Sequence, residues 1–300
     1  MISICIPIYN HYTYPLVRRL DTQIASAGRE DYEIVCIDDH SSGYYLNQNK
    51  GIGELARYIQ LEKNVGRASI RNLFLKYAKG EYLLFLDCDS IVPEQFVKTY
   101  AKTLGSNPSV VVGGRVYDER YNDTKHRLRY LYGTKIESQP VAVRRVNPYR
   151  SFQTSNFMVR RDVLEHIPFD ESISKYGHED TLFGYQLEQY LVPILHIDNP
   201  VVNGEVEENA EFLHKTVEAV ESLAEIYDRM WEDQRFCESV RLLHTYNRVR
   251  RLKLQKLVYN VFNLVKGPLE SRFVSGNGIN LKYFSFYKLG VLIKQIHYNR

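Results

Sequence analysis

Short apolar runs alternate with longer stretches of mixed polarity over roughly the first 120 residues. The runs are rich in Ile, Val, Leu and Tyr, as buried strands are, and they lie at 2–8, 32–38, 58–62, 82–87 and 109–117. Helix-like stretches separate them at 15–27, 67–79 and 93–104. Pro15 and Pro93 open two of these stretches, and Gly80 closes the third. Strands that alternate with helices predict a parallel, doubly wound α/β sheet.

The pattern changes after residue 117. Residues 118–150 are irregular, basic and rich in tyrosine, and we interpret them as an insertion or a mobile loop. A strand leading into a short helix is predicted at 153–164, and a loop at 169–189 that becomes a helix near Glu179. A long helix is predicted over about 208–230. From residue 232 the pattern is helical, basic and aromatic, with breaks predicted at 266–268 and 275–278.

Composition places the chain among ordinary globular proteins. It has 300 residues, 44% hydrophobic and 25% charged, which suits about two domains. No apolar run approaches the ~18–20 residues of a membrane span, and the start MISICIPIYN has no basic leader that would indicate a signal peptide. The cysteines show no CxxC spacing and are expected to be free; they are Cys5, Cys36, Cys88 and Cys237. A cytoplasmic, reducing compartment is therefore predicted.

Two aspartates follow the run at 82–87. If the strand continued, Asp87 and Asp89 would point to one side and Cys88 to the other. Two carboxylates at the carboxyl end of a sheet suit Mg²⁺ or Mn²⁺ carrying substrate phosphates. The alternative is a solvated turn or a helix cap, in which Asp89 or Ser90 caps the helix that starts at Pro93.

Two further acidic pairs are candidates for chemistry. Asp38 and Asp39 end another predicted strand and could accept hydrogen bonds from a base or a ribose, or could cap a turn. Glu179 and Asp180 open a predicted helix, where acids commonly complement the helix dipole; the functional alternative is a general base. The chain has neither GxGxxG after its first strand nor GxxxxGK[ST]. Without those phosphate-binding loops, a diphosphate ligand would need a metal, which favours the metal interpretation of Asp87 and Asp89.

Several motifs taken together resemble those of the family 2 glycosyltransferases. In chain order they are ISICIPIYN, IDDHSS, NVGRASIRN, GEYLLFLDCDS, SNFMVRRDVLEHIPFDE and YGHEDTLFGYQL. The resemblance covers about residues 2–215. It implies a GT-A fold, with a Rossmann-like mixed sheet, over 1–230. Residues 1–117 would be the nucleotide-binding half and 118–230 the acceptor half, with a helical extension over 231–300.

The resemblance also implies residue roles. Nucleotide contacts are expected from Pro7, Tyr9, Asn10, Asp38, Asp39, Arg67, Arg71 and Asp87. Asp89 would bind Mn²⁺ or Mg²⁺ directly, and Asp87 would reach the ribose or a metal-bound water. Asp180 would be the catalytic base, with Glu179 beside it. Donor sugar or acceptor would lie near Ser155, Asn156 and His178. Asn203 stands where relatives often carry a metal-binding histidine.

The implied function is metal-dependent, inverting transfer of a sugar from a nucleotide-diphosphate sugar, with UDP as the expected carrier. The acceptor would be a hydroxyl of a glycan or lipid-linked glycan in bacterial polysaccharide biosynthesis. The chemistry is consistent, because such a transfer needs one base for the acceptor and a cation for the departing diphosphate. The alternative is a non-catalytic nucleotide-sugar-binding or scaffolding relative, for which Asn203 is the sequence support.

The C-terminal sixty residues differ in charge from the rest. The net charge is +3, but residues 241–300 hold 12 Lys and Arg and a single acid, Glu270. Apolar residues recur among them at roughly helical spacing: Val249, Leu252, Leu257, Val258 and Val261. One interpretation is a helix packed on the transferase domain with a solvated basic face. The other is peripheral docking on the anionic inner face of the cell membrane. No nucleic-acid-binding motif accompanies the charge, so nucleic acid is not an expected partner.

Overall fold

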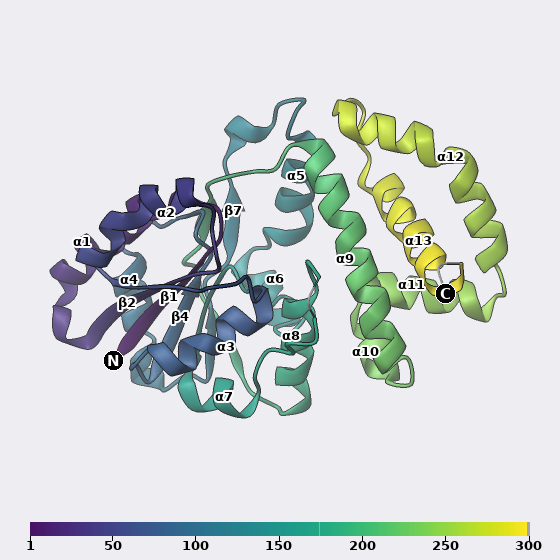
Figure 1. Ribbon diagram of the computed structural model, residues 1–300. Coiled ribbons are helices and arrows are strands. Elements are labelled where there is room, and N and C mark those ends of the chain that lie inside the picture. The colour runs from purple at the N-terminus through teal and green to yellow at the C-terminus, as the bar shows by residue number, and fades with distance from the viewer. Residues whose placement is uncertain (174, 299–300) are drawn as a thin grey trace. The chain divides into compact units, whose positions relative to one another are not determined.

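The computed structural model describes residues 1–173 and 175–298 (Figure 1). These residues form two compact units. The first unit contains 1–118, 138–173 and 182–205, and the second contains 119–137, 175–181 and 206–298.

A seven-stranded sheet forms the centre of the first unit, in the order β3-β2-β1-β4-β8-β6-β9. Its strands are β1 (Ile2–Ile8), β2 (Tyr32–Asp38), β3 (Arg57–Gln60), β4 (Tyr82–Leu86), β6 (Val110–Val112), β8 (Asn156–Arg160) and β9 (Ile194–His196). β8 runs antiparallel to both of its neighbours, whereas the other pairings are parallel. The mixed α/β sheet is confirmed. The parallel arrangement predicted for the strands of the first 120 residues holds for β1, β2, β3 and β4. The antiparallel β8 belongs to the strand predicted separately at 153–164.

Helices cover both faces of this sheet because its strands are apolar on both sides. Ile4 and Ile6 of β1 pack with α1 (Tyr14–Ala27) and α4 (Phe96–Ala101). Cys5, between them, faces the opposite side. That side is covered by α3 (Arg67–Tyr77), α7 (Arg161–His166) and the later residues of α8 (Glu179–Gln189). Burying each such side chain contributes about 1.5–3 kcal/mol, so the two cores hold the sheet in place.

A three-stranded sheet with the order β5-β10-β7 lies beyond the end of β4. Its strands are β5 (Ser90–Ile91), β7 (Arg115–Tyr117) and β10 (Val201–Asn203). The single strand predicted at 109–117 is therefore wrong, because the chain turns at Gly113 and Gly114 and continues in another sheet. Gly114 has φ +96°, and a Cβ on Gly113 would lie 2.4 Å from Asn156 Nδ2. Both glycines are thus required for the change of sheet.

The segment 118–150 contains more helix than predicted. It includes α5 (Arg127–Tyr132), a π-helical turn (Gly133–Glu137) and α6 (Val141–Val146). The remaining short elements are α2 (Gly43–Asn49) and the 3-10 turns Arg29–Asp31, Lys50–Glu54, Leu104–Ser106 and Glu119–Tyr121. These helices are only one to two turns long, and so short a stretch carries little helical periodicity.

The second unit is mainly helical. Its helices are α9 (Asn209–Met230), α10 (Gln234–Ser239), α11 (Arg241–Arg251), α12 (Gln255–Ser275) and α13 (Leu281–His297), together with α5. α13 packs against α9, α11 and α12. Gly290 of α13 lets the ring of Phe262 approach closely, since a Cβ there would overlap that ring. The long helix predicted at 208–230 is confirmed as α9. The functional division predicted at residue 230 stays a prediction.

The predicted break at 266–268 is wrong, because α12 continues through Gly267 and Pro268. Proline removes one helical hydrogen bond and frees the carbonyl of Leu264, four residues earlier. Leu264 is 80% exposed, so water can satisfy that carbonyl. The break predicted at 275–278 is confirmed: α12 ends at Ser275, and Gly276 follows with φ +74°. Among the described helices, none combines the length and apolar character needed to span a membrane.

Candidate active site

The polar clusters that follow β1, β2 and β4 lie at one edge of the large sheet. The three strands are parallel neighbours, with β1 in the middle, so their carboxyl ends meet. Tyr9 and Asn10 follow β1, Asp38 ends β2, and Asp87 follows β4. A backbone hydrogen bond of 2.7 Å from Asp39 N to Ile8 O ties the first two ends together. Three clusters that are far apart in the sequence are thus brought to one edge of the sheet.

Asn10 joins the loops after β1 and β2. Its N–H donates to Ser41 Oγ at 2.8 Å, and its Oδ1 accepts from Ser42 N at 2.8 Å. Asn10 has φ +47°, a conformation that asparagine tolerates better than most residues. Tyr9 beside it is 54% exposed, and Pro7 is partly exposed within β1. An exposed ring on a fixed loop is suited to contact with a planar base. The contact of Tyr9 with a nucleotide base stays a prediction.

Asp38 and Asp39 are buried and bonded to the chain's own donors. Asp38 accepts from Ser41 N at 2.7 Å and from Tyr58 Oη at 3.0 Å. Asp39 accepts from Val65 N at 2.7 Å and Gly66 N at 3.0 Å. Burial raises the pKa of Asp39, and these two N–H groups oppose that shift. The pair therefore shapes the loops that border the edge, and its contact with a nucleotide stays a prediction.

Asp87 lies between two arginines. Arg71 Nη2 is 3.4 Å from one carboxylate oxygen of Asp87, and Arg115 Nη2 is 3.4 Å from the other. Arg71 is almost fully buried in α3, one turn after the exposed Arg67, whose carbonyl accepts from Arg71 Nη1 at 3.0 Å. Arg71 thus belongs to the charged cluster around Asp87. The expected contacts of Arg67 and Arg71 with a nucleotide stay predictions.

Arg115 is a site residue that the sequence interpretation missed. It seemed to lie inside one strand at 109–117, but the turn at Gly113 and Gly114 carries it into β7 and toward Asp87. The Gly-Gly pair could have indicated the change of direction, since glycines inside a strand pattern often mark a bend. The arginine after that bend joins Asp87 and Arg71 in one charged cluster.

Asp87, Cys88 and Asp89 form a turn. β4 ends at Leu86, and Ser90 N donates to Asp87 O at 3.1 Å. The strand-alternation argument is therefore wrong, because no strand continues through these residues. The expected direction of Cys88 is nevertheless confirmed, since it packs against the core shared by β1 and α1. Burial, together with Asp89 and Asp87, raises the pKa of its thiol, so Cys88 stays protonated.

Strand β10 fixes the backbone of this turn. Asn203 pairs with Ser90, and Gly204 N donates to Asp89 O at 2.9 Å. A Cβ on Gly204 would lie 2.3 Å from that same oxygen. Asn203 is buried, and its Nδ2 donates to Glu205 O at 2.6 Å. Asn203 thus lies beside the acidic turn, as its sequence position suggested, and its amide is bonded within the loop.

Ser155 and Asn156 lie beside Asp87 at the start of β8. Ser155 O accepts from Asp87 N at 3.1 Å. The buried Ser155 Oγ has no hydrogen-bond partner among the described residues, and an unsatisfied buried hydroxyl costs about 1–3 kcal/mol. Asn156 accepts from Tyr100 Oη at 2.7 Å and donates to Gly114 O at 2.8 Å. Asn156 is therefore engaged in the fold, whereas Ser155 offers a hydroxyl; their contacts with a sugar stay predictions.

The candidate base belongs to the second unit, whereas the residues above belong to the first. α8 begins at Glu179, as predicted. Asp180 Oδ1 accepts from Thr181 N at 2.6 Å, and a carboxylate in a first helical turn is stabilised by the helix dipole. Glu179 is buried, and Asp180 is partly exposed. Of the acidic pair, Asp180 is the more accessible to a substrate.

The loop before Asp180 is held against α9. Gly177 and His178 have φ +93° and +68°, and Ser222 Oγ donates to Gly177 O at 2.9 Å. Burial, with a smaller effect of Lys288, lowers the pKa of His178 to about 4. His178 is therefore neutral at pH 7 and bonds Thr181 Oγ1 at 3.1 Å through Nδ1. Its expected contact with donor sugar or acceptor stays a prediction.

The acidic turn fits a cation that arrives with its substrate. Among the described residues, no group of three or more His, Cys, Asp or Glu could hold a metal ion. Magnesium is often bound through one or two carboxylates, with substrate phosphates and water as the remaining ligands. Asp89, with Asp87 beside it, would supply that minimal protein contribution, and the metal itself stays a prediction.

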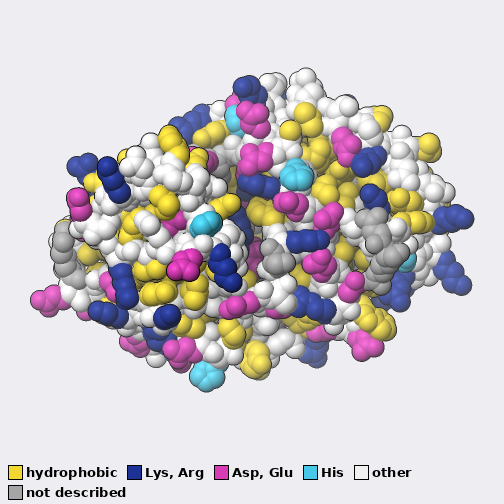
Figure 2. Space-filling view, in the orientation of Figure 1, with side chains coloured by type: hydrophobic (Ala, Val, Ile, Leu, Met, Phe, Trp, Pro, Cys, Tyr) yellow, Lys and Arg dark blue, Asp and Glu magenta, His cyan; other side chains and the backbone are white. Residues whose placement is uncertain are grey.

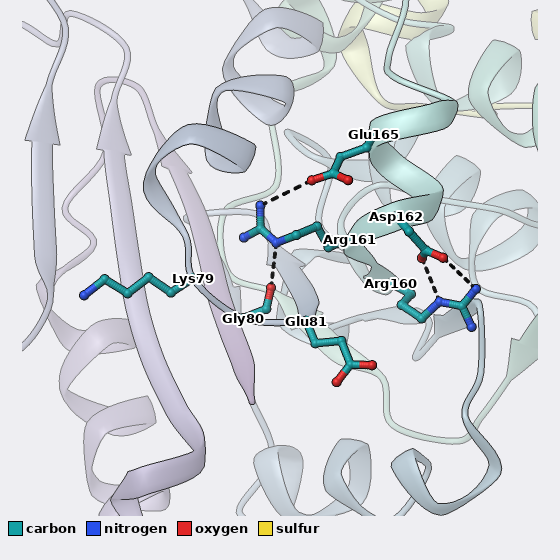
Figure 3. A pocket seen from close by; sticks show the side chains of 7 residues that line it. All are labelled: Lys79, Gly80, Glu81, Arg160, Arg161, Asp162 and Glu165. Carbon is teal, nitrogen blue, oxygen red and sulfur yellow. Dashed lines mark hydrogen bonds and ion pairs between the residues drawn. The ribbon is translucent and has the colours of Figure 1, made fainter.

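A cavity of about 460 Å³ lies at the opposite end of β4 (Figure 3). Its lining residues are Lys79, Gly80, Glu81, Arg160, Arg161, Asp162 and Glu165. Arg160 binds Asp162 at 2.7 Å, and Arg161 donates to Gly80 O at 2.9 Å. Glu81 precedes β4 and Asp87 follows it, so the cavity is separate from the candidate active site. Two of its ion pairs join lining residues to each other: Arg160 with Asp162, and Arg161 with Glu165.

The fold is the GT-A fold of nucleotide-sugar transferases. Mannosyltransferase PcManGT from Pyrobaculum calidifontis, solved with GDP-Man and Mn²⁺, has a TM-score of 0.57 at 15% identity; the match covers 100% of this chain and 88% of that one. TarS 1–349 of S. aureus, solved with UDP-GlcNAc, has a TM-score of 0.51 at 19% identity, covering 100% and 93%.

The sequence profile described as Glycosyl transferase family 2 matches residues 3–168, more than half of the chain. The chain belongs to this family. The poly(ribitol-phosphate) beta-N-acetylglucosaminyltransferase TarP of Staphylococcus aureus is 42% identical over 89 residues, which are 28% of this chain and 27% of TarP. Glycosyltransferase GlyG of Streptococcus pneumoniae is 25% identical over 200 residues, which are 62% of this chain and 65% of GlyG. The matched segments span less than two thirds of either relative.

Proposed function

We propose that the protein transfers a sugar from a nucleotide-diphosphate sugar to a hydroxyl of a bacterial polysaccharide. The observation that carries this proposal is the cluster of Arg71, Asp87 and Arg115 at the edge where β1, β2 and β4 end, with Asp89 in the same turn as Asp87. Ligands of α/β sheets bind at such edges, and the charges suit a diphosphate. Membership of glycosyl transferase family 2 supports the same reaction.

The proposed acceptor is a glycan or polyol-phosphate chain, lipid-linked and reached from the cytoplasmic side. Support comes from two relatives. TarP acts, by its name, on poly(ribitol-phosphate), and so does a beta-glucosyltransferase of Bacillus spizizenii that is 34% identical over 120 residues. The proposed donor is a UDP-sugar, as in the TarS complex with UDP-GlcNAc.

In the proposed reaction, Asp180 accepts the proton of the acceptor hydroxyl. The hydroxyl oxygen bonds to the anomeric carbon on the face opposite the diphosphate, and the bond from that carbon to the diphosphate oxygen breaks. The configuration at this carbon is therefore inverted. Arg71 and Arg115 hold Asp87 in place and add positive charge near the departing group. Mn²⁺ or Mg²⁺ bound through Asp89 would supply further charge neutralisation.

Nucleotide binding can be tested by thermal unfolding of the full chain. UDP and UDP-sugars with Mn²⁺ should raise the Tm clearly, because a ligand at 100 times its Kd adds about 2.7 kcal/mol to the free energy of unfolding. Without Mn²⁺ the rise should be smaller. A larger rise with GDP would contradict the choice of UDP, and no rise with any nucleotide would contradict the proposed function. Binding with no turnover across an acceptor panel would favour the non-catalytic alternative.

Gly204→Ala should lower the rate of sugar transfer about 100-fold, since a displacement of about 1 Å at a catalytic centre can have that effect. The added methyl would overlap Asp89 O and shift the acidic turn. The matched control is Gly53→Ala, because a Cβ on Gly53 meets nothing within 4 Å. Steady-state release of UDP measures both variants. Equal rates for the two variants would show that the rate of sugar transfer does not depend on the position of Asp89.

A further inference from the structure

The structure of the basic C-terminal segment differs from the single amphipathic helix suggested by the sequence. The sequence suggested one helical stripe that includes Val249 and Val258, but these two side chains are partly buried. The chain instead makes a corner, with α11 ending at Arg251 and α12 starting at Gln255. The exposed apolar residues lie at this corner and along α12: Leu252 (67%), Leu254 (39%), Leu257 (59%), Val261 (42%) and Leu264 (80%).

These residues form one surface, which we call the apolar corner. Leu257, Val261 and Leu264 are spaced i, i+4 and i+7, so they share one face of α12. The opposite face of α12 packs inside the second unit, where Phe262 and Phe273 are buried. α12 therefore has one packed face and one face with exposed leucines, an arrangement typical of an interaction site.

Exposed basic side chains lie among the residues of the apolar corner along the sequence. Arg251, Lys253 and Lys256 are all exposed, and the sequence from 241 to 269 contains no Asp or Glu. Hydrophobic side chains and Lys or Arg also lie close together in Figure 2, over the part of the molecule where Figure 1 places α12. Apolar side chains bordered by cations match a surface with an apolar interior and anionic head groups.

Lys253 occupies a backbone position at the corner that ordinarily favours glycine. Its φ is +56°. Lys253 N donates to Arg250 O and Leu254 N donates to Val249 O, both at 3.0 Å. These bonds are a Schellman motif, whose left-handed residue is usually glycine. A lysine there is strained relative to glycine, and such strain is often retained where the side chain has a role.

We propose that the apolar corner docks on the anionic surface of a lipid membrane. Leu252, Leu254, Leu257 and Leu264 would enter the boundary between head groups and acyl chains, while Arg251, Lys253 and Lys256 contact lipid phosphates. The binding partner is a lipid surface for a reason of complementarity. The cations of the apolar corner require negative charge and its leucines require an apolar region, and an anionic bilayer supplies both. This proposal does not depend on the catalytic assignment.

Co-sedimentation of the full chain with vesicles tests the proposal. Phosphatidylcholine vesicles that contain phosphatidylglycerol should bind the protein, and phosphatidylcholine alone should bind it much more weakly. Replacing Arg251, Lys253 and Lys256 by Gln should weaken binding about 100-fold, because each cation near an anionic surface contributes about fivefold. High salt should weaken binding as well. Equal binding to both kinds of vesicle would overturn the proposal.

Two variants separate docking from folding. Lys253→Gly should keep or raise the Tm and weaken vesicle binding about fivefold. Leu257→Gln with Leu264→Gln should weaken binding at least about tenfold, whereas the control Leu191→Gln, at a side chain 81% exposed in the first unit, should not. Unchanged binding by the double variant would overturn the proposal. So would a dimer in sedimentation velocity that the double variant dissociates, because a second copy would then be the occupant.

Discussion

Asp180→Asn should lower the rate of sugar transfer by about 10²–10⁴-fold, the usual contribution of a general base. An amide cannot take the proton of the acceptor hydroxyl, whereas its oxygen can still accept from Thr181 N as Asp180 does. Loss of the carboxylate from the first turn of α8 should change the free energy of unfolding by at most about 1 kcal/mol. The measurement combines UDP release in the presence of acceptor with thermal unfolding.

Glu179→Gln is the matched control for this prediction. Glu179 is the neighbouring carboxylate of the same helical turn and is buried, so it should contribute far less to proton transfer. UDP-sugar with Mn²⁺ should raise the Tm of both variants and of the natural chain by the same amount. If Asp180→Asn keeps most of its turnover, Asp180 is not the base. If Glu179→Gln is the inactive variant, the two roles are exchanged.

Asp89→Asn is expected to remove both turnover and the effect of Mn²⁺ on nucleotide binding. The substitution takes away the negative charge that would bind the cation. The backbone carbonyl that accepts from Gly204 N is unchanged, so the turn should keep its shape. Thermal unfolding with UDP, over a series of Mn²⁺ concentrations, should give the same Tm with and without the metal.

Asp87→Asn provides the contrast with Asp89→Asn. It leaves Arg71, almost fully buried, and Arg115 without the carboxylate that lies between them. The free energy of unfolding should fall by about 1–3 kcal/mol, as measured by denaturant titration without ligand. Asp89→Asn should show no comparable loss. An Mn²⁺-dependent rise in the Tm of Asp89→Asn would assign the metal to other residues.

Local sequence patterns were sufficient to predict several helices and strands. β1, β2 and α9 follow their apolar patterns closely, and α8 begins at Glu179 as predicted. These elements are regular over seven or more residues, so their periodicity is distinct. The clustering of Asn10, Asp38 and Asp87 follows from one topological rule, that parallel neighbouring strands end at a common edge.

Other features depend on contacts between distant parts of the chain. Periodicity indicates burial but not strand direction, so the antiparallel β8 resembled any other apolar strand. The pairing of Arg115 with Asp87 joins residues 28 positions apart, across a change of sheet that only Gly113 and Gly114 signal. α12 continues through Pro268, and the exposure of Leu264 that makes this tolerable is not given by the sequence.

Strand β10 pairs with two strands that position different residues of the candidate site. On one side it pairs with β5, directly after Asp89, and on the other with β7, which starts at Arg115. A substitution that moves β10 would therefore displace the carboxylate proposed for the cation and the guanidinium proposed near the diphosphate at the same time. Metal affinity and nucleotide affinity should then change together in β10 variants. Selecting for one of these properties through β10 would select for the other as well.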